Sequence, residues 1–325
     1  MILLNLISRI FRKLYFISHR KKLVFHQDFR YVELFDQLAN DYVFNEITKG
    51  KPLMVSKFGT VELDVLAGYR SSKQKKYSFN DVLDFIKCER ITLNSVPSLD
   101  KLCSNAGFFP NDPSLIDRFY NIYVSSIKNI DILGSYIPVE KMFFSELKFA
   151  KKVNLYGYYF PFLYHNPWTK LLKGKKVLVI HPFKEEIEYQ YNRRKEIWGE
   201  KVNDILPDFT LLTYKAVQSM GCGLDCTYSN WFDALDKMKL DIKKIDFDIA
   251  IIGCGAYGMP LASYVKDLGK ISIHLAGCTQ LLFGIIGKRW QDMEMFDEII
   301  NDSWIHPFKE SVPKIAKNIE HGCYW

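Results

Sequence analysis

"FDIAIIGCGAYGMPLA", residues 247–262, is the stretch that decides the expected fold. Its first seven residues are mostly apolar and have the length of a buried strand. Gly253, Gly255 and Gly258 follow in the spacing G-x-G-x-x-G, and a helical pattern begins near Pro260. A strand, a glycine turn and a helix in this order are typical of a parallel α/β sheet.

Further strands and helices alternate along the chain. Short runs rich in apolar and β-branched residues predict strands at 52–58, 175–182, 209–217 and 270–277. Helical patterns are expected at 185–203, 231–244 and 260–268. The sequence therefore predicts an α/β fold, with a Rossmann-like, doubly wound, mainly parallel sheet covered by helices on both faces.

The charge distribution separates the start of the chain from the rest. The whole chain has a net charge of +7, and residues 1–30 hold seven Lys or Arg residues against one Asp. We interpret residues 1–27 as a basic amphipathic arm and residues 28–325 as a single α/β domain, with a helix-rich section at about 77–173 over the sheet. Because the domain itself is close to neutral, nucleic acid is not expected as a partner.

The basic arm has the pattern of an amphipathic helix. Polar residues recur at helical spacing from Asn5 to Lys13, and apolar residues fill the other face. The apolar stretch is interrupted by charge at Arg9 and is too short to cross a bilayer. Residues 1–25 are expected either to lie on an anionic, cytoplasm-facing membrane surface or to pack their apolar face on the body of the protein.

Cysteine usage indicates a reducing compartment. The seven cysteines are odd in number and scattered, and the closest pair, Cys222 and Cys226, has three residues between its members. This spacing differs from that of the usual zinc or redox motif. We expect a cytoplasmic protein, peripheral on the inner face of the membrane if the arm binds lipid.

Candidate site residues follow the predicted strands. Ligands of such sheets bind beyond the carboxyl ends of the strands, so residues at these positions are expected to share one pocket. They include histidines, lysines, a carboxylate and the glycine turn, which together suit a phosphorylated ligand: Lys57, Gly59, Thr60, Glu62, His181, Lys184, Gly253, Gly255, Ala256, Tyr257, Gly258, His274 and Gln280.

The glycine turn indicates an anion but does not identify it. Backbone N–H groups and the start of a helix would suit a diphosphate. A dinucleotide site would also need an acidic residue about 20 positions later, at the end of the next strand, to hold the ribose. His274 occupies that region, so NAD is not expected. An NAD-type oxidoreductase and a purely structural tight turn are the alternatives.

Several motifs together carry a resemblance to a known family. They are "SKFGTVEL" at 56–63, "NAGFFP" at 105–110, "VLVIHPFKE" at 177–185, the segment 246–290 from "DFDIAIIG" to "GKRW", and "GCYW" at 322–325. In these motifs the chain resembles the bacterial glycosyltransferases of the GT-D fold and their relatives encoded with capsule and surface-polysaccharide genes. The resemblance implies transfer of a sugar from a nucleotide-sugar donor such as a UDP-sugar to a glycan or lipid-linked acceptor, often with a divalent metal.

One departure from the family bears on the metal. The Asp-x-Glu pair of the family aligns with Thr60 and Glu62, so the first acid is missing. Mn²⁺ or Mg²⁺ would then have Glu62 as its carboxylate ligand, whereas such an ion usually takes one or two. The alternative is a metal-free site. In that case the leaving diphosphate would be neutralised by side chains from the set Lys57, Lys184, His181, His274, Lys288 and Arg289.

The roles expected at this stage are as follows. Glu62 is the candidate general base toward an acceptor hydroxyl, with His181 and His274 as further catalytic candidates. Lys288 and Arg289 lie in the "GKRW" loop and are expected to contact phosphate. A non-catalytic component of a polysaccharide assembly complex is the other alternative.

Overall fold

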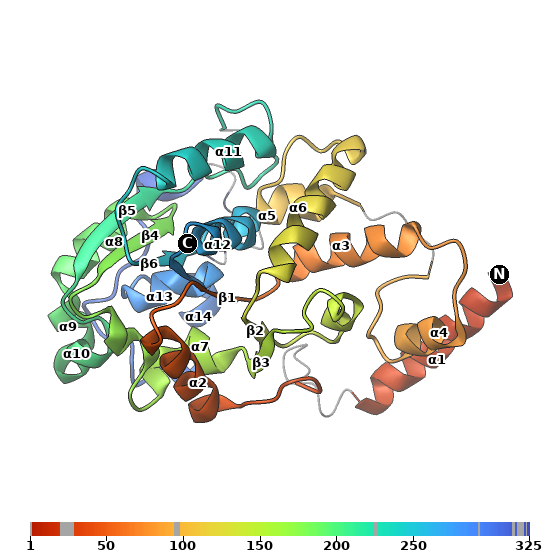
Figure 1. The fold of residues 1–325 in the computed structure, drawn as a ribbon, viewed down its shortest axis with the longest axis horizontal. Helices are drawn as coiled ribbons and strands as arrows, with labels where there is room; N and C mark the ends of the chain where they lie inside the picture. Colours follow the sequence, from red (N-terminus) through yellow and green to blue (C-terminus); the bar gives the residue numbers. More distant parts are fainter. Residues whose placement is uncertain are drawn as a thin grey trace.

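A computed structural model gives the structure of the chain. It describes residues 2–19, 29–93, 98–223, 226–291, 293–313, 316, 322 and 324–325. The helices and strands named below lie within these ranges, and all of them except β7 are labelled in Figure 1.

The centre of the fold is one seven-stranded sheet in which all neighbouring strands are parallel, in the order β3-β2-β1-β7-β6-β4-β5. The strands are β1 (Leu53–Ser56), β2 (Ile132–Ser135), β3 (Lys151–Asn154), β4 (Lys176–His181), β5 (Thr210–Lys215), β6 (Ile249–Ile252) and β7 (Ile271–His274). The predicted doubly wound α/β class is confirmed.

Strand residues alternate between two hydrophobic cores, one on each face of the sheet. In β4, Val177 and Val179 join one core, and Leu178 and Ile180 join the other. The first core holds α2 (Asp36–Thr48), α7 (Tyr156–Tyr159), α8 (Lys184–Asn192), α9 (Arg194–Trp198), α10 (Val202–Ile205), α13 (Thr279–Leu282) and α14 (Lys288–Gln291). The second holds α3 (Thr60–Ser72), α5 (Asp100–Ala106), α6 (Ile116–Lys128), α11 (Trp231–Ile242) and α12 (Gly258–Asp267).

The section at about 77–173 is where the sequence prediction was incomplete. The structure places two strands there, β2 and β3, which extend the sheet beyond β1. β2 has two apolar residues followed by Gly134 and Ser135, and β3 begins with two lysines, so neither presents the apolar run of a central strand. The helical prediction at 185–203 was also too continuous, because α8, α9 and α10 divide this range.

The N-terminal helix α1 (Ile2–His19) lies beside α4 (Phe79–Ile86), at the opposite end of the molecule from β5 (Figure 1). Its described large apolar side chains, among them Phe11 and Leu14, are exposed. These described side chains are therefore not packed on the body. Within the described residues, no helix is both long enough and apolar enough to span a bilayer.

Candidate functional site

A cavity of about 490 Å³ opens at the carboxyl edge of the sheet. Its size is within the range of small-molecule sites. Residues at or just beyond the ends of all seven strands line it: Lys57 after β1, Tyr136 after β2, Leu155 after β3, His181 at the end of β4, Val217 after β5, Gly253 after β6 and His274 at the end of β7. The cavity thus lies where ligands of open parallel sheets bind.

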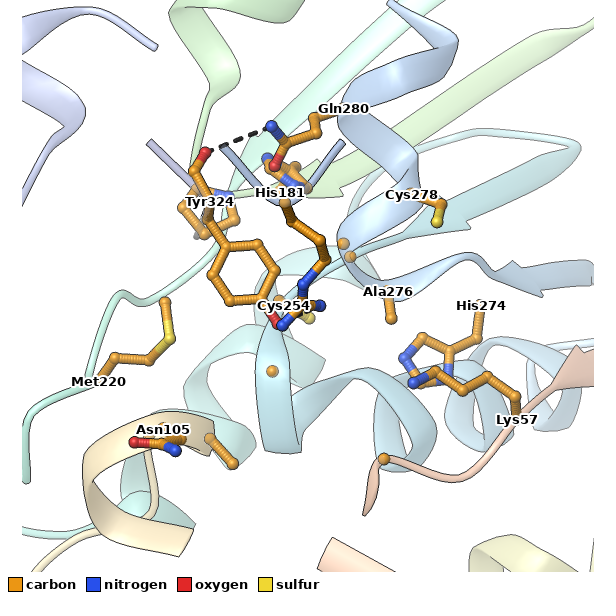
Figure 2. A pocket seen from close by; sticks show the side chains of 18 of the residues that line it. Lys57, Asn105, His181, Met220, Cys254, His274, Ala276, Cys278, Gln280 and Tyr324 are labelled. Carbon is orange, nitrogen blue, oxygen red and sulfur yellow. Dashed lines mark hydrogen bonds between the residues drawn. The ribbon is translucent and has the colours of Figure 1, made fainter. Parts of the chain in front are cut away.

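Most of the predicted site residues meet in this cavity. The lining includes Lys57, Gly59, Thr60, Glu62, His181, Gly253, Gly255, Tyr257, His274, Gln280 and Arg289. Figure 2 shows Lys57 and His274 on one side of the cavity and Gln280 with Tyr324 on another, joined by the hydrogen bond from Gln280 Nε2 to the Tyr324 carbonyl at 3.3 Å.

Four predicted residues are not among those that line the cavity. Lys184 lies 3.8 Å from Glu188 in an ion pair on the surface of α8, and Lys288 is exposed. Ala256 is fully buried, and its carbonyl accepts a hydrogen bond from the Tyr123 hydroxyl at 2.6 Å. The fourth residue, Gly258, is the first residue of α12 and packs against a histidine ring.

The two histidines are buried and neutral at physiological pH. Burial lowers the pKa of His181 to about 3, and burial together with the nearby Lys57 charge lowers the pKa of His274 to about 3. His181 Nδ1 accepts from the Phe183 N–H at 3.0 Å, so the ring proton is on Nε2. Neither histidine supplies positive charge to a diphosphate, but the His181 Nε2–H group is a hydrogen-bond donor.

His274 is held at the centre of the sheet. Its Nδ1 lies 3.0 Å from the Ser56 hydroxyl of the neighbouring strand β1, and its buried Nε2 has no hydrogen-bond partner among the described residues. A Cβ on Gly258 would lie 2.2 Å from that Nε2 atom. Gly258 therefore leaves the space that the His274 ring fills.

The other two glycines of the turn are also in close contact with the protein itself. A Cβ on Gly253 would lie 2.3 Å from the Ala276 carbonyl oxygen, and one on Gly255 would lie 2.7 Å from the Ala106 carbonyl oxygen. Gly255 also has a positive φ of 55°, which favours glycine. Packing alone thus accounts for all three glycines, so their spacing is weaker support for a phosphate than the sequence indicated.

Glu62 lies over the start of its own helix. A Cβ on Gly59 would lie 2.0 Å from a Glu62 carboxylate oxygen, and Glu62 is 9% exposed. Asp64 is exposed and does not line the cavity, so the two carboxylates do not converge. In the described part of the chain, no three His, Cys, Asp or Glu side chains form a group able to hold a metal ion.

Lys57 and Arg289 are the two cationic side chains that line the cavity within the described ranges. Lys57 Nζ lies 5.6 Å from the centre of the Tyr136 ring. The Arg289 guanidinium lies 4.6 Å from the Tyr324 ring centre, and Arg289 Nη1 donates to the Tyr324 hydroxyl at 3.2 Å. Each of these two cations therefore lies beside an aromatic ring in the lining of the cavity.

Tyr136 lies among the charged groups of the cavity. Burial, Glu140 and Glu62 raise its pKa, whereas Arg289 lowers it. Its hydroxyl donates to the Phe58 carbonyl at 2.8 Å, so the phenol is fixed in place. Glu62, Lys57 and Arg289 line the same cavity as Tyr136, and Lys57 lies over the Tyr136 ring.

Sequence reasoning missed several lining residues, mainly aromatic. They are Asn105, Tyr136, Tyr156, Tyr159, Phe160, Tyr324 and Trp325. Two signals were available, because "NAGFFP" contains Asn105 and "GCYW" contains the last two of these residues. Tyr136 had no such signal, since it follows the unpredicted strand β2.

No match to this chain was found among models of known protein families, among curated proteins or among solved structures. The fold class therefore rests on the sheet described above, and the function is inferred from the site.

Proposed function

We propose that this protein is a glycosyltransferase that moves a sugar from a nucleoside-diphosphate-sugar donor to a glycan or lipid-linked acceptor in the synthesis of a surface polysaccharide. The observation that carries the proposal is that one carboxylate, Glu62, and two cations, Lys57 and Arg289, line the same cavity at the carboxyl edge of the sheet.

The charges suit the two ends of such a reaction. Lys57 and Arg289 would neutralise the negative charge that grows on the departing diphosphate. Glu62 would take the proton of the acceptor hydroxyl. The oxygen of that hydroxyl would form a bond to the anomeric carbon of the donor sugar, while the bond between this carbon and the phosphate oxygen breaks. The buried His181 would contribute a neutral hydrogen-bond donor.

The aromatic lining suits the remaining parts of the donor. Tyr136, Tyr159 and Trp290 line the cavity, and aromatic rings of this kind can stack on a nucleobase or a sugar ring. The single cavity carboxylate in the described residues gives Mn²⁺ or Mg²⁺ one protein ligand, so we favour phosphate neutralisation by side chains.

The site does not favour a nicotinamide dinucleotide. A site for such a dinucleotide would carry an acidic residue at the end of the strand that follows the glycine turn, where it would hold the ribose hydroxyls. That strand is β7, and its last residue is His274, which is buried against Ser56. The site therefore lacks the side chain that would select a dinucleotide.

We also propose a cytoplasmic location. The six cysteines within the described residues are free thiols, which fits a reducing compartment.

The proposal is tested by thermal unfolding with nucleoside diphosphates, nucleotide sugars and NAD, with and without Mn²⁺. A diphosphate at 100 times its Kd would stabilise the protein by about 2.7 kcal/mol. We expect Lys57→Met and Arg289→Met to weaken this effect, and Lys184→Met, a cation outside the cavity, to leave it unchanged. Stabilisation by NAD alone, or by none of these ligands, would contradict the proposal.

Turnover is tested separately from binding. We expect Glu62→Gln to keep the stabilisation by nucleoside diphosphate and to lose slow hydrolysis of the nucleotide sugar. Glu185→Gln is the matched control, because Glu185 pairs with Lys215 on the surface. Equal rates of hydrolysis by the two variants would contradict the proposed role of Glu62 as the general base.

A further inference from the structure

Among the described side chains of helix α1, Ser8 and Arg12 contact the body of the protein. Ser8 is 2% exposed, and Arg12 Nη1 donates to the carbonyls of Arg90 and Ile91 at 3.0 and 2.9 Å. The Arg12 guanidinium also lies 4.5 Å from the Phe85 ring centre. This arrangement is the reverse of the usual one, in which an amphipathic helix buries its apolar face.

The opposite side of α1 is apolar and exposed. Five large side chains recur there at helical spacing and fall within an arc of about 120°. Their exposed fractions are 42% for Ile7, 54% for Ile10, 53% for Phe11, 57% for Leu14 and 57% for Ile17. We call these five residues the α1 apolar face. An exposed apolar patch of this kind marks an interaction surface.

Positive charge borders the α1 apolar face. Arg9 and Lys13 are exposed, and their helical positions lie between the apolar face and the side that contacts the body. The sequence continues with Arg20, Lys21 and Lys22, whose structure lies outside the described residues. An apolar face with flanking cations is complementary to an anionic lipid surface, where headgroups meet the cations and acyl chains meet the apolar side chains.

We propose that the α1 apolar face docks this protein on an anionic lipid membrane. The helix would lie in the plane of the interface. A second copy of the chain is a poorer partner, because a self-paired α1 would bring Arg9 and Lys13 close to the like charges of the other copy. This inference goes beyond the proposed function, since it concerns a surface on α1 and not the cavity.

The test measures binding of the full chain to vesicles by co-sedimentation. We expect binding to vesicles of equal parts phosphatidylcholine and phosphatidylglycerol, and at least about tenfold weaker binding to phosphatidylcholine alone. The paired changes Phe11→Ser and Leu14→Ser should weaken binding at least about tenfold. The matched control changes two exposed apolar residues elsewhere, Phe149→Ser and Leu240→Ser, and should bind as the parent does.

A second variant tests the charges without altering the apolar face. Arg9→Gln with Lys13→Gln should lower binding to the anionic vesicles by about fivefold for each cation removed. Equal binding by the Phe11/Leu14 variant and its control would overturn the proposal, as would equal binding to anionic and neutral vesicles. A concentration-dependent dimer that the Phe11/Leu14 changes abolish, with no vesicle binding, would instead assign the face to a second copy. Nucleotide binding is unaffected in each case, so this test is independent of the proposed function.

Discussion

Glu140 makes the stability of this protein depend on pH in an unusual direction. The carboxyl is fully buried in the turn after β2, where it accepts from the N–H groups of Tyr136 and Ile137 at 3.1 and 3.2 Å and from the Ser135 hydroxyl. Burial outweighs these hydrogen bonds and raises its pKa from 4.5 to about 7. The folded state therefore holds a proton that the unfolded state releases between these two values.

The sign and size follow from this difference. Stability from Glu140 is fully present below its unfolded pKa and is lost as pH rises through the folded pKa. With one pKa unit equal to about 1.4 kcal/mol, the loss between about pH 5 and pH 8 is on the order of 2–3 kcal/mol. Glu140→Gln keeps an acceptor for both N–H groups and can donate to Ser135, so we expect this variant to lack that loss.

The assay is urea unfolding of wild type and Glu140→Gln across this pH range, read as the difference in the free energy of unfolding. The variant should gain on wild type as pH rises. Glu146→Gln is the control. Against the effect of burial, Arg70 lowers the pKa of Glu146 from 4.5, so this carboxyl titrates below the pH range of the assay and the difference between this variant and wild type should stay constant across it. Parallel curves for wild type and Glu140→Gln, or a Glu140→Gln variant that loses stability relative to wild type at high pH, would refute the reasoning.

Three further outcomes are expected. Gly258→Ala should lower stability by about 1–3 kcal/mol in thermal unfolding, because its Cβ would lie 2.2 Å from His274 Nε2. An unchanged melting temperature would mean that the ring moves freely. The depressed pKa of His181 contributes stability that is present above pH 6.5 and lost as pH falls. The free energy of unfolding of His181→Asn should therefore decrease less than that of wild type as the pH is lowered from 6.5. Lys57→Met should weaken nucleoside diphosphate binding about tenfold or more and reduce its salt dependence in calorimetry, whereas an unchanged salt dependence would place the phosphates elsewhere.

The central strands could be predicted because their residues are apolar on both faces. β4 and β6 present continuous apolar runs, and both were located within one or two residues. β2 and β3 were not predicted, because β2 has two apolar residues followed by Gly134 and Ser135, and β3 has Val153 as its one apolar residue. Their positions depend on tertiary pairing, of β2 with β1 and of β3 with β2.

The residues of the candidate site were likewise predictable only in part. Lys57 and His181 were predicted because they lie at or directly after recognisable strands, and the topology brings such positions to one edge. The sequence could not show that the histidines are neutral, since their pKa depends on burial that the whole fold creates. Nor could it show that the Gly255 position is filled by the Ala106 carbonyl, because that contact joins residues far apart in the chain.

The position of β7 has a consequence for synthesis of the chain. β7 lies between β1 and β6, and it is the strand that joins the group β1, β2 and β3 to the group β4, β5 and β6. Leu53 of β1 pairs with Ile271 of β7, so most of the chain must be synthesised before the second neighbour of β1 is present. Until then, β1 and β6 each have an open edge that can pair with another polypeptide. A nascent or truncated chain that ends before β7 is therefore expected to aggregate, and the cavity cannot form until this last strand is inserted.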